Sequence, residues 1–262
     1  MKKSPFRSTV RVRKGGIFVK LSDHTVLITG GASGIGLALA EQFIRNDNQV
    51  IIVGRDENKL KRLKSQYPHI TTYACHVEVV EQLNLLVQQL YDNHPELNVL
   101  INNAGVQYNY SFMDPSHTTH QIEQEIAINL TAPVLLISKL LPLLDRQPQA
   151  AIVNVSSGLG LVPKKSAPVY CGTKAGLHMF TKALRYQLES TNIQVFEIIP
   201  PVVDTDMTKG RGRNKITPDQ LAVEFLSYFQ KNRYEVPIGK VKLLNLINRW
   251  YPALAEKILK NG

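Results

Sequence analysis

The sequence predicts an α/β fold: a doubly wound parallel sheet of about seven strands, flanked by helices in a three-layer α/β/α arrangement. Short apolar runs alternate with helical patterns along the body of the chain. The runs are continuously apolar, as expected for parallel strands that helices cover on both faces. Strands that alternate with helices at this spacing are typical of βαβ units. The 262 residues, 44% of them hydrophobic, suffice for one large core.

The expected elements follow one another in a regular order. Strands are expected at 25–29, 49–53, 70–74, 99–101, 151–155 and 194–199, with a short seventh candidate at 234–238. Helices are expected at 37–46, 57–66, 80–92, 119–144, 169–190 and 218–230. Residues 204–216 are polar and contain glycine, which predicts a mobile loop.

The charge divides the chain into three parts. The formal net charge is +10. Residues 1–20 carry seven basic residues and no acid, whereas 21–208 carry a net −4 and 209–262 a net +7. A mildly acidic body argues against nucleic-acid binding. We therefore expect a basic N-terminal extension over 1–20, one main domain over 21–240, and an amphipathic helical segment over 241–262 that packs on it.

The cysteines and apolar runs predict a cytoplasmic protein without a metal site. Cys75 and Cys171 are far apart and in no Cys/His ligand spacing, which suits a reducing compartment. The basic N-terminus lacks an apolar stretch of signal-peptide length, and no run is expected to span a membrane. His117 and His120 have no carboxylate between them, so we expect a solvated loop there and no metal ligands.

A glycine-rich turn follows the first strand. Residues 29–36 read Thr-Gly-Gly-Ala-Ser-Gly-Ile-Gly and lead into a helix. Glycines let the backbone turn tightly and approach a pyrophosphate, while the helix presents free N–H groups and the positive end of its dipole. The pattern therefore predicts a Rossmann-like dinucleotide site. The expected contacts are Gly30, Ser33, Gly34, Ile35 and Gly36.

The residues at the end of the second strand indicate whether the cofactor is NAD or NADP. An acidic residue there binds the adenosine ribose of NAD, but the position is Gly54, and Arg55 follows it. A guanidinium matches phosphate geometry with paired hydrogen bonds. We therefore expect NADP(H) rather than NAD(H), with Arg55 on the 2′-phosphate. The alternative is a solvated Arg55 beside Asp56, which would cap the next helix.

Further motifs follow in a set order. An Asn-Asn-Ala-Gly motif at 102–105 ends the fourth strand, and Asn129 lies within a long helix. Ser157 ends the fifth strand, thirteen residues before Tyr170. Tyr170 and Lys174 share one helix face at i and i+4. Together with the glycine turn, this set resembles the classical short-chain dehydrogenase/reductase family over residues 21–205.

The resemblance implies a role for each motif. The catalytic residues would be Asn129, Ser157, Tyr170 and Lys174. Further cofactor contacts would be Asn103, Ala104, Gly105, Tyr170, Lys174, Val203 and Thr205. Asn129 would interrupt its helix and hold a water that touches Lys174. Val203 and Thr205 would bind the nicotinamide end, since they lie in the segment that corresponds to the family's Pro-Gly-x-Val-x-Thr motif.

The expected reaction is hydride transfer between NADP(H) and a carbonyl or secondary alcohol of a small molecule. Hydride addition to a carbonyl creates an alkoxide that needs a proton. Tyrosine ordinarily has a pKa of about 10, and the positive charges of Lys174 and oxidised nicotinamide are expected to lower the pKa of Tyr170. Tyr170 would then act as general acid/base, while Ser157 orients the substrate oxygen and stabilises its charge.

Two positions depart from the family's pattern. His76 stands where many members have aspartate, and Pro201 replaces a glycine. These departures leave a non-catalytic NADP(H)-sensing or scaffolding protein as an alternative, and an isomerase or dehydratase with the same site as a third. Aromatic and aliphatic residues near 107–114, 159–166 and 201–216 suggest an apolar substrate pocket. We expect a homodimer or homotetramer.

The C-terminal segment has apolar residues at helical spacing, with lysine and arginine between them. Three interpretations are ranked in this order: a helix packed on the body or over the substrate cleft, a subunit interface, and contact with a membrane surface. The same segment and the Pro200-Pro201 element resemble, less extensively, bacterial oxidoreductases named after the D-alanyl-lipoteichoic acid gene cluster.

Overall fold

A computed structural model describes residues 20–113, 119–212 and 214–260. The expected extension over 1–20, except Lys20, lies outside the described residues, as does His117. Within the described part, seven strands form one parallel sheet in the order β3-β2-β1-β4-β5-β6-β7. They are β1 (Thr25–Thr29), β2 (Gln49–Gly54), β3 (Thr71–Ala74), β4 (Val99–Asn102), β5 (Ala150–Val155), β6 (Ile193–Ile199) and β7 (Glu235–Pro237). The predicted doubly wound α/β fold is confirmed.

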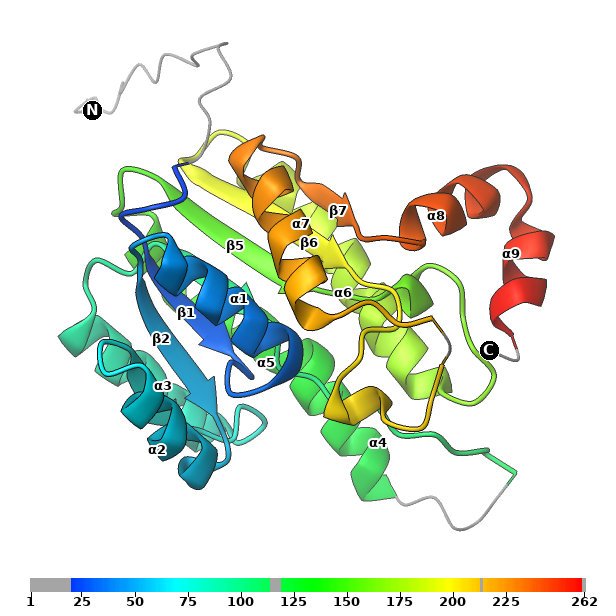
Figure 1. Cartoon of the computed structure of the whole chain (residues 1–262), viewed down its shortest axis with the longest axis horizontal. Coiled ribbons are helices and arrows are strands. Elements are labelled where there is room, and N and C mark those ends of the chain that lie inside the picture. Colours follow the sequence, from blue (N-terminus) through cyan, green and yellow to red (C-terminus); the bar gives the residue numbers. More distant parts are fainter. Residues whose placement is uncertain (1–19, 114–118, 213, 261–262) are drawn as a thin grey trace, which may run out of the picture.

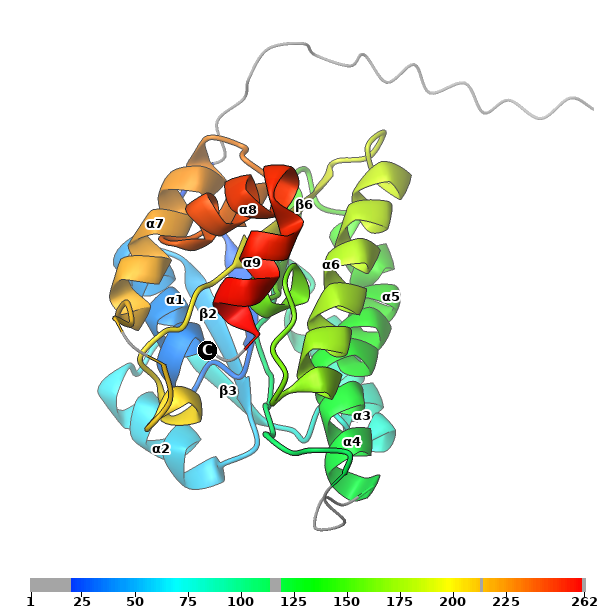
Figure 2. The same cartoon turned by 90° about the vertical axis from the view of Figure 1, so that its right-hand side faces the viewer.

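Helices cover both faces of this sheet (Figures 1 and 2). One layer holds α1 (Gly34–Arg45), α2 (Glu57–Gln66) and α7 (Pro218–Gln230); the other holds α3 (Val80–Asn93), α4 (Thr119–Ile126), α5 (Ala132–Leu144) and α6 (Pro168–Gln187). Alternate residues of each strand enter opposite layers. In β1, Val26 and Ile28 join the core that contains Phe43, whereas Leu27 joins the core that contains Leu140. Both strand faces are therefore apolar, which explains the continuous runs in the sequence.

The helix expected over 119–144 is interrupted. A π-helical turn, Ala127–Thr131, separates α4 from α5, which places the interruption at Asn129 as expected. Among the described residues, the stretch Thr119–Leu144 is long and apolar enough to cross a membrane by length and composition alone. Its most apolar part is 44% buried, and Leu136, Leu140 and Leu144 of this stretch belong to the core under β4 and β5, as in the core helix of a globular domain.

The C-terminal segment forms two helices, α8 (Val241–Trp250) and α9 (Pro252–Leu259). Figure 1 shows them, in red, beyond the β7 side of the sheet. Pro252 occupies the first turn of α9, where a missing N–H costs no helical hydrogen bond, and it separates the two helices. Residues 204–216 contain a 3-10 turn, Asp206–Thr208, and a bridge between Val203 and Ile216.

Candidate active site

The candidate site lies where the strand order reverses, at the carboxyl ends of β1 and β4. Open α/β sheets bind ligands at such a point. Here the glycine turn leads from β1 into α1, and Gly30 and Gly34 have φ of +64° and +55°. A Cβ on Gly36 would lie 2.3 Å from the carbonyl oxygen of Gly30, so only glycine fits. Ser33 makes no side-chain capping hydrogen bond to α1, so its side chain satisfies none of the N–H groups in the first turn of this helix.

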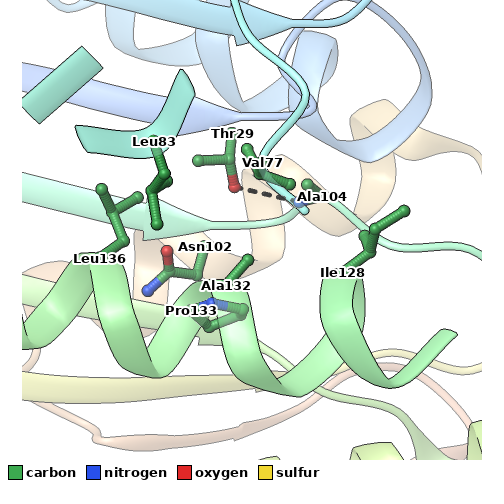
Figure 3. A pocket seen from close by; sticks show the side chains of 9 residues that line it. All are labelled: Thr29, Val77, Leu83, Asn102, Ala104, Ile128, Ala132, Pro133 and Leu136. Carbon is green, nitrogen blue, oxygen red and sulfur yellow. Dashed lines mark hydrogen bonds between the residues drawn. The ribbon is translucent and has the colours of Figure 1, made fainter. Parts of the chain in front are cut away.

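Polar side chains fasten the glycine turn to the end of β4. Asn103 Nδ2 donates hydrogen bonds to the carbonyl oxygens of Thr29 and Gly30, at 3.0 and 3.1 Å. The hydroxyl of Thr29 accepts the N–H groups of Asn103 and Ala104, both at 3.1 Å. Figure 3 shows the second of these bonds above a small cavity, whose other lining includes Asn102. The cavity is about 10 Å³, room for one water molecule.

Asn129 holds the segment that follows this turn. Its Oδ1 accepts the N–H of Val106 and its Nδ2 donates to the carbonyl oxygen of the same residue, both at 2.9 Å. Gly105 leaves the space between Asn129 and Lys174, because a Cβ there would lie 3.2 Å from Asn129 Oδ1 and 3.7 Å from Lys174 Nζ. The structure thus brings Asn129 and Lys174 to one place, and the water expected between them stays a prediction.

The side chains of Ser157, Tyr170 and Lys174 meet at the carboxyl end of β5. Tyr170 and Lys174 lie in the first turns of α6 and are 9% and 4% exposed. Lys174 Nζ donates to the carbonyl oxygen of Val155 at 2.8 Å and lies 5.8 Å from the centre of the Tyr170 ring. Ser157 Oγ accepts the N–H of Leu159 at 3.1 Å, and its hydroxyl favours the ionised form of the Tyr170 phenol.

Burial dominates the protonation of both ionisable groups. It raises the pKa of Tyr170 to about 12, although the Ser157 hydroxyl and Arg211 act in the opposite direction. It lowers the pKa of Lys174 to about 8, and the Glu197 carboxylate offsets part of this change. The sequence reasoning expected a lowered pKa for Tyr170. In the chain without nicotinamide, the loss of water around the phenol outweighs nearby positive charge. The lowered pKa expected with oxidised nicotinamide bound stays a prediction.

The residues expected around the adenosine follow β2 and β3 and are exposed. Arg55 is exposed after β2, and within the described residues it forms no hydrogen bond or ion pair. Asp56 caps α2 by accepting the N–H of Lys59 at 3.0 Å. The cap and a free Arg55 therefore coexist. His76 is exposed, and its ring lies 3.4 Å from a carboxylate oxygen of Glu78.

The segment after β6 returns to the glycine turn. Val203 is buried, and the Thr205 side chain lies 3.0 Å from the point where a Cβ of Gly34 would be. Thr208 accepts the N–H of Thr205 through its hydroxyl. Thr205, which was expected to bind the nicotinamide end of the cofactor, therefore lies against the glycine turn, which was expected to bind the phosphates.

The sequence reasoning missed three charged residues in this region. Glu125 is fully buried and accepts the N–H of Tyr108 at 3.0 Å and the hydroxyl of Tyr110 at 3.3 Å. Glu197 is also fully buried, with both carboxylate oxygens 2.9 Å from His178 Nδ1. Glu125 precedes Asn129 by four residues, a helical spacing that could have indicated it. Glu197 is an acid within an otherwise apolar strand. The sequence does not show what it faces, and only the fold places it under α6.

Arg211, the third of these residues, joins two of the loops expected to line the substrate pocket. Its guanidinium donates to Asn109 Oδ1 at 3.4 Å and to the carbonyl oxygen of Met207. The N–H of Tyr110 donates to the carbonyl oxygen of Ser166 at 3.1 Å. The three loops near 107–113, 159–166 and 204–212 are therefore joined to one another near Tyr170, and the apolar substrate pocket expected there stays a prediction.

Comparison with known proteins agrees with this geometry. The family model for short chain dehydrogenases matches residues 24–216. The chain belongs to this family. It is 41% identical over 229 residues to a Bacillus subtilis protein named uncharacterized oxidoreductase DltE, covering 87% of this chain and 90% of that one. The expected resemblance to oxidoreductases of this name is thereby confirmed.

Two solved structures show the same fold with a nicotinamide cofactor bound. A short-chain dehydrogenase from Sphingobium yanoikuyae, in complex with NADPH, has a TM-score of 0.77 and 26% identity, over 88% of this chain and 94% of that one. A short chain dehydrogenase/reductase from Burkholderia phymatum, in complex with NAD, has a TM-score of 0.80 and 18% identity, over 93% and 97%. The chain is thus an oxidoreductase of this family, and a nicotinamide cofactor is supported.

The residues present fit such a cofactor. The space at Gly30 and Gly36 admits no side chain, and the uncapped N-terminus of α1 faces that space. Backbone N–H groups around a glycine turn are the usual partners of a pyrophosphate. The glycine turn therefore suits the two phosphates of the pyrophosphate that NAD and NADP share.

Proposed function

We propose that the chain is an NADP(H)-dependent reductase that transfers hydride between the cofactor and a carbonyl or secondary alcohol group. The observation that carries the proposal is the convergence of Ser157, Tyr170 and Lys174 at the carboxyl end of β5, beside the glycine turn. A bound nicotinamide supplies or accepts the hydride. The protein's part is to place the substrate oxygen and to move one proton.

Each of the three side chains has a defined role in this proposal. Ser157 Oγ donates a hydrogen bond to the substrate oxygen and stabilises the negative charge that develops there. Tyr170 Oη gives its proton to that oxygen during reduction and takes it back during oxidation. A pKa of about 12 keeps Tyr170 protonated at neutral pH, which suits carbonyl reduction. Lys174, held by the Val155 carbonyl, supplies positive charge and a contact to the nicotinamide ribose.

Arg55 supports the choice of NADP(H). Its guanidinium is exposed beside the glycine turn and has no partner among the described residues. Gly54 places no carboxylate at the end of β2 that would repel a 2′-phosphate. A free guanidinium at this position suits the 2′-phosphate that distinguishes NADP from NAD.

The test of the reaction is NADPH oxidation with a panel of aldehydes and ketones. We expect Tyr170→Phe to lower kcat by about 10²- to 10⁴-fold, because the variant lacks the proton that the alkoxide needs. Its affinity for NADPH, measured by fluorescence titration, should fall by no more than about tenfold, the cost of one lost hydrogen bond. NADPH binding by the native chain without turnover on any substrate would instead favour the sensing or scaffolding protein.

The test of the cofactor is Arg55→Ala. Loss of a charge-assisted hydrogen bond to the 2′-phosphate should raise the Kd for NADPH about 10- to 100-fold and leave the Kd for NADH unchanged. Lys61→Ala, which changes an exposed basic residue of the neighbouring helix, is the matched control. Equal losses of affinity for both cofactors would contradict the assignment of Arg55.

A further inference from the structure

The helices α8 and α9 both expose large apolar side chains. Leu243, Leu246 and Trp250 are 61%, 57% and 65% exposed, and their i, i+3 and i+7 spacing places them along one stripe of α8. On α9, Leu254 and Ile258 lie at i and i+4 and are 48% and 50% exposed. Five large apolar side chains on two adjoining helices are more than scattered surface residues.

The opposite side of these helices is anchored to the body. Val241 and Ala255 are buried, and Lys242 forms an ion pair with Glu224 of α7 at 2.6 Å. A Cβ on Gly158 would lie 3.5 Å from the Leu244 side chain, so this leucine faces the body. The apolar stripe is therefore held outward by packing on its reverse side.

The same two helices and their ends carry exposed basic residues. Lys240, Arg249, Lys257 and Lys260 are all exposed, and none has an ion-pair partner among the described residues. Glu256 is the one acidic residue in 240–260. Two copies of such a face would bring like charges together, which opposes their pairing. An anionic surface would attract each basic residue near it.

We propose that the exposed face of α8 and α9 docks the protein on an anionic phospholipid bilayer. Leu243, Leu246 and Trp250 would enter the boundary between headgroups and acyl chains, as the apolar faces of interfacial helices do. The basic residues would contact the lipid phosphates. Tryptophan suits this depth because its ring is apolar and its N–H is polar.

The docking face adjoins the candidate active site. Gly158, which follows Ser157, packs against Val241 and Leu244. At the other end of the segment, the N–H of Lys165 donates to the carbonyl oxygen of Lys260 at 3.1 Å. Residues 158–165, one of the loops that meet beside Tyr170, therefore lie between the catalytic side chains and the docking helices.

The chain carries its own probe for this proposal, because Trp250 is the single tryptophan. The full-length protein is mixed with phosphatidylcholine vesicles that contain phosphatidylglycerol, at low salt. We expect a blue shift of the tryptophan emission and quenching by lipids brominated on their acyl chains. Pure phosphatidylcholine or high salt should reduce the bound fraction, measured by flotation, at least about fivefold, because the basic residues contribute through charge.

Matched variants separate docking from other effects. Leu246→Glu should lower binding to the anionic vesicles at least about tenfold, since a carboxylate replaces a side chain that would be buried. Leu85→Glu changes a residue of α3 that is 60% exposed and should bind as the native chain does. NADPH affinity serves as the folding check for both variants.

Two results would overturn the proposal. One is the absence of any emission shift and of flotation with anionic vesicles at low salt. The other is a native dimer, measured by analytical ultracentrifugation, that Leu246→Glu converts to a monomer while Leu85→Glu does not. That result would assign the face to a second copy of the chain.

Discussion

The ammonium group of Lys174 is buried, and the carboxylate of one buried acid, Glu197, favours its charged form. Burial lowers its pKa to about 8, and Glu197 acts in the opposite direction. Glu197 lies on β6 beside Asn154 of β5 and is held by His178, one helical turn beyond Lys174. The other charged groups on this side, Arg185 and Glu235, pair with each other at 3.5 Å. Glu197 is therefore the acid whose charge reaches Lys174.

Glu197→Gln is expected to shift the pH dependence of the reaction. Removal of the negative charge disfavours the charged lysine, so the pKa of Lys174 falls and its charge is lost at lower pH. The alkaline limb of kcat/KM should move to lower pH by about one unit. Glu235→Gln, a half-exposed neighbour, is the control and should leave the profile in place. An unchanged limb in Glu197→Gln would show that Glu197 acts only through packing.

Single residues of the site differ in how well the sequence predicts them. Gly36 and Tyr170 belong to local patterns whose spacing has a physical cause, a turn in one case and a helix face in the other. Glu197 acts on Lys174 from another strand, and no local spacing encodes that proximity. The pKa of Tyr170 also depends on burial by distant segments, an effect that local spacing does not encode.

At the scale of elements, α4 places a carboxyl group inside the protein next to the site. Burial raises the pKa of Glu125 above its ordinary value of 4.5. As pH rises above that value, the unfolded chain has already released the proton that the folded chain still holds. The free energy of unfolding therefore falls with rising pH through this window.

Glu125→Gln should remove this pH dependence and keep the shape of the side chain. We expect urea unfolding between about pH 5 and about pH 8 to give a flatter stability curve than that of the native chain. Glu123→Gln, on the exposed side of the same helix, should retain the native slope. Equal slopes in the native chain and Glu125→Gln would mean that Glu125 titrates normally.

The ends of the strands were predicted more accurately from the sequence pattern than the start of the first helix. The seven strands lie within one residue of their expected ends, because continuous apolar runs end where the sheet ends. The helix after β1 begins at Gly34 rather than at 37, because the glycine turn continues directly into helical backbone. The periodicity of 241–260 showed an apolar face, but whether that face is covered depends on the geometry of the body, which no pattern in the segment encodes.

At the scale of the whole molecule, one aromatic cluster joins three elements on one side of the sheet. Phe229 of α7 is fully buried, and its ring centre lies 6.1 Å from that of Phe43 in α1 and 4.9 Å from that of Phe196 in β6. Phe225 lies 5.5 Å away on the same helix. The cluster therefore fastens α1 and α7 to the sheet and to each other.

Phe229→Ala should lower the free energy of unfolding by about 3–5 kcal/mol, because it removes a buried ring and leaves a cavity between three elements. Chemical denaturation of the full chain measures this loss. Tyr186→Ala changes an aromatic residue of α6 that is 67% exposed, and its effect should stay below about 0.5 kcal/mol. Similar losses in both variants would contradict a central role for the cluster.

The fastening of the glycine turn by Asn103 has a consequence for synthesis on the ribosome. The bonds from Asn103 to Thr29 and Gly30 span 74 and 73 residues of chain. A nascent chain that ends before β4 has the whole glycine motif but lacks the side chain that shapes it. The dinucleotide cradle therefore matures only after residue 103 leaves the exit tunnel and β4 pairs with β1, so the cofactor stabilises a late stage of folding rather than its start.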